Sequence, residues 1–571
     1  MQAAVNRDLE VDKMGEANTT FGSLRLRNAA TNEIILIPTP SNDPNDPLNW
    51  SPVFRYYVAI LVCAAIFFCN FLAAGPSVAI VEITSDFFGP PGPDFAQHIS
   101  SASYFFTTTA LLQGMGNLVW MPLIVKFGRR PAYVASFTLY VVTAAWAGGA
   151  TSYGSELGAR ILMGFASGAA ECLAPLTIAD MFFLHERGTV MAIYTCALSA
   201  GVAGGIIISG LVTINHDWRY IYWVSVSLIG ACVVLVYFTF PETYYKRDAS
   251  VAGAATALDP EILEDVHLRG EGEIHNKEHD KEIPRLSHDE NRQSPNNVLK
   301  PEDSMASGDC IPEKKSYIQS LALWTGTYTS ETLAKLIIRP IVLLVLPPVL
   351  WATLVMSVTI GFLVAITSNF ASAFESAYGF EPWQSGLCFI SGLVGNFIGI
   401  FAGGKMSDMV ADFFTKRNNG IREPEMRLPA ILISLITGPL ALLLYGAGID
   451  RNLHWMCPTV GLGLLSFSIV QATNVTLVYT IDSYRPVAGE ITVTQLAFKS
   501  AFGFLLSFYT NPWINQSGYL NAFGAMAGIS GGVIIMFVPF YFYGRRIRHV
   551  TWHWKFVKRL AHWDEDREVG E

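Results

Sequence analysis

Two ionisable residues stand in one long apolar stretch of the chain, at a spacing that places them on one side of a helix. Arg160 and Glu171 are eleven residues apart, about three helical turns, and Gly164 and Gly168 lie between them on the same face. A charged side chain inside a membrane helix is costly unless it faces a partner or a water-filled cavity. We therefore expect Arg160 and Glu171 to serve proton coupling, with Glu171 as the protonatable group. The alternative is a structural pair between Glu171 and a neighbouring helix.

Polar residues in two later apolar stretches are the candidates for substrate contact. Gln471 and Asn474 lie in the first of these stretches, and Glu490 and Lys499 lie in the second. Positions 490 and 499 are nine residues apart, about 180° around a helix, so they do not line one cavity together. Lys499 lies nearer the middle of its stretch and suits an anionic or polar substrate. Glu490 lies near the cytosolic entrance and is expected to make a structural contact instead. The predicted substrate cavity therefore contains Gln471, Asn474 and Lys499.

These residues belong to a series of apolar runs of about 20 residues, each long enough to cross a hydrocarbon core of about 30 Å. Six runs precede a polar insert and six follow it, and the ten-residue alternation of β-barrel strands is absent from the sequence. The sequence thus predicts an all-α membrane protein with twelve transmembrane helices. The predicted spans are 57–80, 101–125, 131–151, 157–180, 188–212, 220–240, 341–366, 386–404, 428–448, 456–480, 487–509 and 518–543.

The distribution of charge agrees with this division. Only 15% of the 571 residues are charged, against about 25% in soluble proteins, and the net charge is −9. The segment 241–315 holds 17 acidic and 10 basic residues, and positive and negative charges balance in the spans and their loops. This pattern excludes a basic nucleic-acid-binding protein. The predicted parts are an N-terminal tail (1–56), a six-helix half (57–240), a largely disordered linker (241–340), a second half (341–543) and a C-terminal tail (544–571).

Basic residues in the short loops predict the orientation, because Lys and Arg accumulate on the cytosolic side. With the N-terminus inside, the cytosolic loops hold ten Lys and Arg residues and the opposite loops hold only Arg219 and Arg451. Both tails and the linker are then predicted to be cytosolic. The eight cysteines show neither a disulfide framework nor metal-ligand spacing, so we predict no metal site and no cofactor.

Charged residues in the predicted cytosolic turns form a candidate gate. The turn after the second span is basic, two acids and an arginine flank the turn after the fourth, and an aspartate follows the eighth. The predicted gate residues are Lys126, Gly128, Arg129, Arg130, Asp180, Glu186, Arg187 and Asp408. The alternative for the basic turn is simple anchoring at the cytosolic surface.

The turn after the second span resembles the loop motif G-x-x-x-D-R-x-G-R-R of the major facilitator superfamily. Gly128, Arg129 and Arg130 match the end of the motif, while Val125 replaces its aspartate. Arg160 and Gly164 match the R-x-x-x-G motif of that family's fourth span. The segments 46–51 and 423–428 resemble those of fungal members, in the drug:proton antiporter and polyamine branch. The resemblance implies two six-helix lobes that bind substrate between them near the membrane midplane.

Glycines in the fifth span resemble the antiporter motif G-x-x-x-G-P-x-x-G-G. Gly201, Gly205 and Gly210 are in register with it, and Ile206 replaces the proline. Small residues at this spacing also allow close helix packing.

The predicted function is secondary active transport, in which a proton gradient drives efflux of a small organic molecule such as a drug, polyamine or secondary metabolite. No nucleotide-binding segment is found, so an ion gradient is the expected energy source. The alternatives are proton-coupled uptake of a polar solute and a transporter-like receptor. An enzyme is not expected, because no nucleophile and base lie together in the spans. The expected partners are substrate, protons and lipid, and the expected form is a monomer in the plasma membrane.

Overall fold

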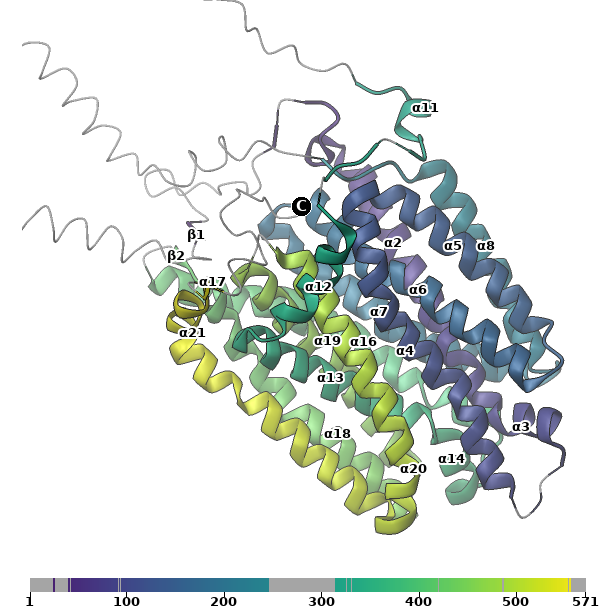
Figure 1. Cartoon of the computed structure of the whole chain (residues 1–571). Helices are drawn as coiled ribbons and strands as arrows, with labels where there is room; N and C mark the ends of the chain where they lie inside the picture. Colours follow the sequence, from purple (N-terminus) through teal and green to yellow (C-terminus); the bar gives the residue numbers. More distant parts are fainter. Residues whose placement is uncertain are drawn as a thin grey trace, which may run out of the picture.

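The computed structural model describes residues 24–25, 40–41, 43–90, 92, 94–245, 314–324, 326–329, 331–418, 421–484, 487–552 and 554–555. Most of the predicted linker, from 246 to 313, and the end of the predicted C-terminal tail lie outside the described residues. Long helices run side by side through the molecule (Figure 1). A two-residue strand, β1 (Leu24–Arg25), pairs antiparallel with β2 (Ile421–Arg422).

The first half is built from η1 and from helices between Pro52 and Thr239. Its elements are η1 (Pro47–Asn49), α2 (Pro52–Ala74), η2 (Gly75–Ala79), α3 (Ile80–Phe88), α4 (Phe95–Phe127), α5 (Arg129–Gly148), α6 (Tyr153–Met181), α7 (Leu184–Val212) and α8 (Arg219–Thr239).

The second half begins after the linker and shows more breaks. Its elements are α11 (Tyr317–Ser320), α12 (Leu333–Leu343), α13 (Pro347–Thr367), α14 (Phe370–Tyr378), α15 (Pro382–Leu387), α16 (Ile390–Phe401), η3 (Ala402–Met406), α17 (Ser407–Arg417), η4 (Pro424–Ile431), α18 (Leu432–Asp450), α19 (Met456–Ser483), α20 (Ala488–Ile535) and α21 (Phe537–Trp552).

Local sequence explains where the helices of the first half begin and end. Ser51 accepts a hydrogen bond from the backbone N–H of Phe54 and Pro52 opens α2, a favourable N-terminal pair. Ser152 caps α6 in the same way. Gly128 separates α4 from α5 with φ of 98°, a conformation that other residues rarely adopt.

Ten helical stretches among the described residues are long and apolar enough to cross a membrane. One of them, Ala488–Thr551, has 64 residues and turns at Gly518, where φ is 78°, so it holds two crossings. The 20-residue α5 packs against α6 and α8 and supplies the remaining crossing. The predicted all-α membrane fold with twelve spans is thereby confirmed.

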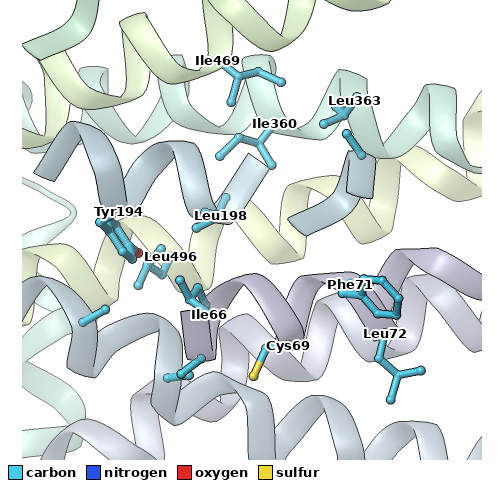
Figure 2. Close-up of a cluster of buried hydrophobic side chains, with 14 of the residues drawn as sticks. Ile66, Cys69, Phe71, Leu72, Tyr194, Leu198, Ile360, Leu363, Ile469 and Leu496 are labelled. Atoms are coloured by element: carbon cyan, nitrogen blue, oxygen red, sulfur yellow. The ribbon is translucent and has the colours of Figure 1, made fainter. Parts of the chain in front are cut away.

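Apolar side chains from both halves meet in one large buried cluster. Figure 2 shows part of it, with Leu198 of the first half near Ile360 of the second, and Ile66 of the first half near Leu496 of the second.

Candidate functional site

A cavity of about 100 Å³ lies between the two halves. Helices α2, α4, α6 and α7 of the first half line it, together with α13, α19 and α20 of the second. Most of its wall is apolar, and the side chains of Leu198, Ile360 and Ile469 in Figure 2 belong to it. Its two charged lining residues are Glu171 and Lys499.

Glu171 and Lys499 form an ion pair between the halves. The ammonium Nζ of Lys499 on α20 contacts Oε1 of Glu171 on α6. The Glu171 side chain is fully buried, and that of Lys499 is 7% exposed. Burying either charge alone costs several kcal/mol, so each charge makes the burial of the other tolerable. In the arrangement of the halves seen here, the burial of each charge therefore depends on the presence of the other.

Glu171 has a second polar neighbour in α4. Nδ2 of Asn117 donates to Oε2 of Glu171 across 3.4 Å. Asn117 is fully buried and does not line the cavity.

Arg160, the other predicted proton-coupling residue, lies away from the cavity lining. Its guanidinium pairs with Glu156 at 3.2 Å, one turn earlier on α6, and donates to the hydroxyl of Tyr222 on α8. It also donates to the carbonyl of Leu72 across 3.2 Å. All three contacts lie inside the first half, so the structure does not bring Arg160 together with Lys499.

The glycines of α6 allow α4 to approach closely. A Cβ on Gly168 would lie 2.5 Å from the carbonyl oxygen of Gln113, and one on Gly164 would meet the backbone of Thr109. The predicted packing glycines of α7 behave similarly. Gly201 and Gly205 lie against the backbone of α2, whereas Gly210 faces Trp383 of α15 in the second half.

Gln471 and Asn474 are buried in the second half and are not among the residues that line the cavity. Gln471 donates to the carbonyl of Ala430 and accepts from Ser434. Asn474 donates to the carbonyl of Gly403 across 2.7 Å. Of the predicted cavity residues, only Lys499 meets Glu171, because helix packing turns the two amides towards η3 and η4.

The basic turn of the first half is held by two carboxylates. Arg129 pairs with Asp180 at 3.1 Å. Oε1 and Oε2 of Glu242 accept from the backbone N–H groups of Arg129 and Arg130, at 2.9 and 3.1 Å. Glu242 thus caps the start of α5, a favourable place for negative charge. The guanidinium of Arg130 donates to the carbonyls of Phe240 and Tyr237, across 2.7 and 2.8 Å.

The other predicted gate residues of the first half are placed as follows. Glu186 lies 3.7 Å from Arg55 of α2. Arg187 donates to the carbonyl of Ala179 across 3.0 Å. The backbone carbonyl of Lys126 accepts from the N–H of Tyr328 across 3.0 Å, which ties the linker end to the turn.

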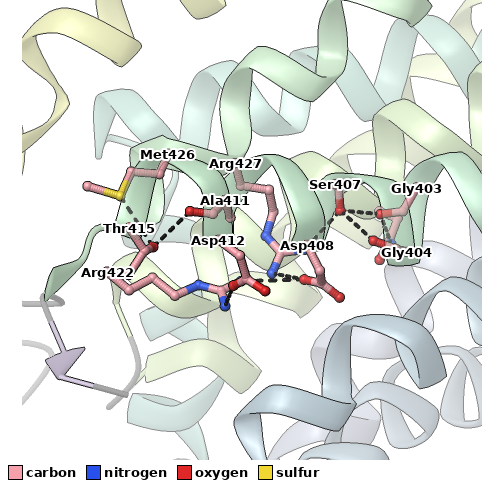
Figure 3. A network of polar contacts seen from close by, with 11 residues as sticks. Gly403, Gly404, Ser407, Asp408, Ala411, Asp412, Thr415, Arg422, Met426 and Arg427 are labelled. Atoms are coloured by element: carbon pink, nitrogen blue, oxygen red, sulfur yellow. Dashed lines mark hydrogen bonds and ion pairs between the residues drawn. The ribbon is translucent and has the colours of Figure 1, made fainter. Parts of the chain in front are cut away.

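Asp408 lies between two arginines of the second half and pairs with both (Figure 3). It pairs with Arg427 at 2.7 Å and with Arg422 at 3.4 Å. Its carboxylate also abuts Gly188, since a Cβ on that glycine would lie 2.6 Å from Oδ2. Asp408 is therefore the predicted gate residue that touches the opposite half.

Sequence reasoning missed several polar groups. Asn117 has no distinctive spacing, and Glu242 caps a helix that lies more than one hundred residues away in the chain. Glu490, for which the sequence favours a structural contact, pairs with Arg339 at 3.1 Å, a partner that the sequence did not indicate. Arg548 and Glu425 form a buried pair with contacts of 2.7 and 2.9 Å. The i, i+4 spacing of Glu156 and Arg160 is a sequence signal that predicts their pair.

Comparisons with known proteins agree with this architecture. A model of the Major Facilitator Superfamily matches residues 60–488. An uncharacterized MFS-type transporter of Schizosaccharomyces pombe is 25% identical, over 91% of this chain and 89% of its own length. Protein HOL1 of Saccharomyces cerevisiae is also 25% identical, over 91% of each chain. The structure of the xylose transporter XylE from E. coli covers 85% of this chain and 100% of its own, with 12% identity and a TM-score of 0.53. The chain therefore belongs to the major facilitator superfamily and is a secondary membrane transporter rather than an enzyme.

Proposed function

We propose that the chain is a proton-coupled transporter that exports a small organic molecule, and that Glu171 is the group that binds the coupling proton. The observation that carries the proposal is the buried pair of Glu171 and Lys499, which joins the halves inside their shared cavity. In an alternating-access transporter the halves rock against one another around such a site.

Protonation of Glu171 changes the energetics of this contact. The neutral carboxylic acid no longer balances the charge of Lys499, so the ionic attraction between α6 and α20 is lost. The ammonium group of Lys499, whose side chain is 7% exposed and lines the cavity, then requires another partner or water. Proton binding thus weakens one arrangement of the halves and favours a change to the other.

Export is the direction we favour, because the glycines of α7 resemble the antiporter motif. A proton that falls through 100 mV releases about 2.3 kcal/mol, enough for roughly a fifty-fold gradient of a neutral solute exchanged one for one. We place the chain in the plasma membrane as a monomer, with both tails and the linker in the cytosol, as the loop charges favour. The turns around Arg129, Asp180 and Asp408 then form the cytosolic gate.

Proton-coupled uptake is the second candidate. The observation that favours it is the ammonium of Lys499 in the cavity wall. An anionic solute that pairs with Lys499 keeps the cavity neutral only when Glu171 carries a proton, so solute and proton would travel together.

The test is transport by the purified chain in liposomes with an imposed pH gradient. Three probes of different charge are used: spermidine, tetraphenylphosphonium and benzoate. We expect at least one probe to move against its own gradient and opposite to the protons, which a pH-sensitive dye reports. Movement in the same direction as the protons would overturn export in favour of uptake. If probes cross but ignore the pH gradient, proton coupling is wrong.

A further inference from the structure

Asn117 presents an unused hydrogen-bond acceptor beside Glu171. Its Nδ2 lies 3.4 Å from Oε2 of Glu171, whereas its Oδ1 has no hydrogen-bond partner among the described residues. Both side chains are fully buried, so the orphaned oxygen has no contact with bulk solvent. A buried acceptor without a partner costs free energy, so its presence next to a protonatable group calls for an explanation.

The structure makes room for this amide. A Cβ on Gly168, three residues before Glu171, would lie 3.2 Å from Oδ1 of Asn117 and 2.5 Å from the Gln113 carbonyl oxygen. The Asn117 side chain therefore lies against Gly168 of α6, which has no side chain and lies within one turn of Glu171. This placement assigns Gly168 a role beyond helix packing.

A primary amide can serve both protonation states of a carboxyl group. The ionised carboxylate needs hydrogen-bond donors, whereas the carboxylic acid needs an acceptor for its O–H. A rotation of the Asn117 amide by about 180° around its Cβ–Cγ bond places Oδ1 where Nδ2–H was. We infer that Asn117 is the positioning residue of Glu171 in both states, an inference that rests on the proposed proton-coupling function.

The proton balance is simple. A proton adds to Oε2 of Glu171, the carboxylate loses its negative charge, and the new O–H donates to Oδ1 of Asn117. Lys499 keeps its proton and its charge but loses its counter-ion. The orphaned oxygen in the ionised state is the acceptor for this step.

No other titratable neighbour competes for this role in the described structure. Lys499 on α20 is a donor only. Tyr194 on α7 donates its hydroxyl to the backbone carbonyl of Glu171 across 3.1 Å. Cys69 on α2 and Cys172 on α6 also lie near Glu171, and both are buried thiols.

The test follows protonation of Glu171 by infrared spectroscopy and needs no substrate. The carboxylic acid C=O band that is absent from Glu171→Gln reports Glu171, and its pH of half-protonation is compared with that of Asn117→Leu. The ionised form keeps Lys499 and loses only a long hydrogen bond, whereas the acid loses its acceptor. We therefore expect the midpoint to fall by about one pH unit.

The opposite result has a clear meaning. If Asn117 serves only the ionised carboxylate, its loss destabilises that form and the midpoint rises. A rise or no change overturns the inference but leaves Glu171 as the proton site. If the Glu171 band is missing in the unmodified chain at all accessible pH values, the proposed function itself fails.

Matched variants separate this effect from general damage. Asn396→Leu removes a fully buried amide of α16 in the second half that is not among the residues lining the cavity, and it is expected to leave the midpoint unchanged. Asn117→Thr and Asn117→Val have the same shape and differ only by a hydroxyl that can donate or accept. We expect the valine variant to titrate about one pH unit below the threonine variant. Equal midpoints in this pair would overturn the inference even if Asn117→Leu does not fold.

Discussion

Replacing Lys499 with methionine removes one member of the buried pair and keeps nearly the same shape. Among the residues that the structure describes, the variant leaves the fully buried carboxylate of Glu171 with one hydrogen bond, from Asn117 at 3.4 Å. Breaking a buried ion pair in this way costs about 3–5 kcal/mol of unfolding free energy. The remaining hydrogen bond offsets at most about 1 kcal/mol, so we expect a loss of about 3 kcal/mol at pH 8.

The double variant Lys499→Met with Glu171→Gln removes both charges and leaves no uncompensated ion. It should cost about 1 kcal/mol, so a double-mutant cycle should give a coupling free energy of at least about 2 kcal/mol. The assay is unfolding of the purified protein by SDS in mixed micelles. The cost of Lys499→Met alone should shrink at lower pH, because protonation removes the unpaired charge. Additive single effects that do not change with pH would refute our view of this pair.

Two further predictions concern packing and the end of the chain. Gly168→Ala should lower the unfolding free energy by about 2 kcal/mol, because the new methyl group meets the Gln113 carbonyl, whereas Gly528→Ala meets nothing within 4 Å and serves as its control. Both are measured by the same SDS titration, and equal effects would contradict the close α4–α6 contact. Arg548→Met should lower the unfolding free energy by about 3 kcal/mol, because it leaves the buried carboxylate of Glu425 without its ion-pair partner. Its control is Arg545→Met. The Arg545 side chain is 44% exposed, so its removal should change the thermal midpoint of unfolding little.

The membrane fold was predictable because hydrophobic run length is a direct physical constraint. Each predicted span coincides with helical structure, and loop charges supported the count. Helix ends were less predictable. α17 continues past the predicted eighth span as a polar helix, and α21 runs to Trp552, where the tail was expected to begin at 544. The ion pair of the partly buried Asp408 with Arg427 holds the start of α17 against η4, and the buried pair of Glu425 with Arg548 holds the end of α21 there.

The candidate site was predictable residue by residue but not as a set. Charge inside a span singled out Glu171 and Lys499, which lie 328 positions apart and meet in the cavity. The same reasoning selected Arg160, Gln471 and Asn474, whose partners lie within their own halves. A polar side chain buried in a membrane helix needs a partner, but the sequence does not show whether that partner lies in the same half or in the other. The rotation of each helix about its axis and the packing of the helices determine which partner it meets.

The central claim is that Glu171 carries the coupling proton, and Glu171→Gln tests it most directly. The measurement compares exchange of a transported probe at equal pH with its accumulation under a pH gradient, in liposomes. We predict that the variant retains exchange and loses pH-driven accumulation. Glu490→Gln, which alters a buried carboxylate paired with Arg339, is the control that should keep pH-driven accumulation. Undiminished pH-driven accumulation by Glu171→Gln would contradict the account.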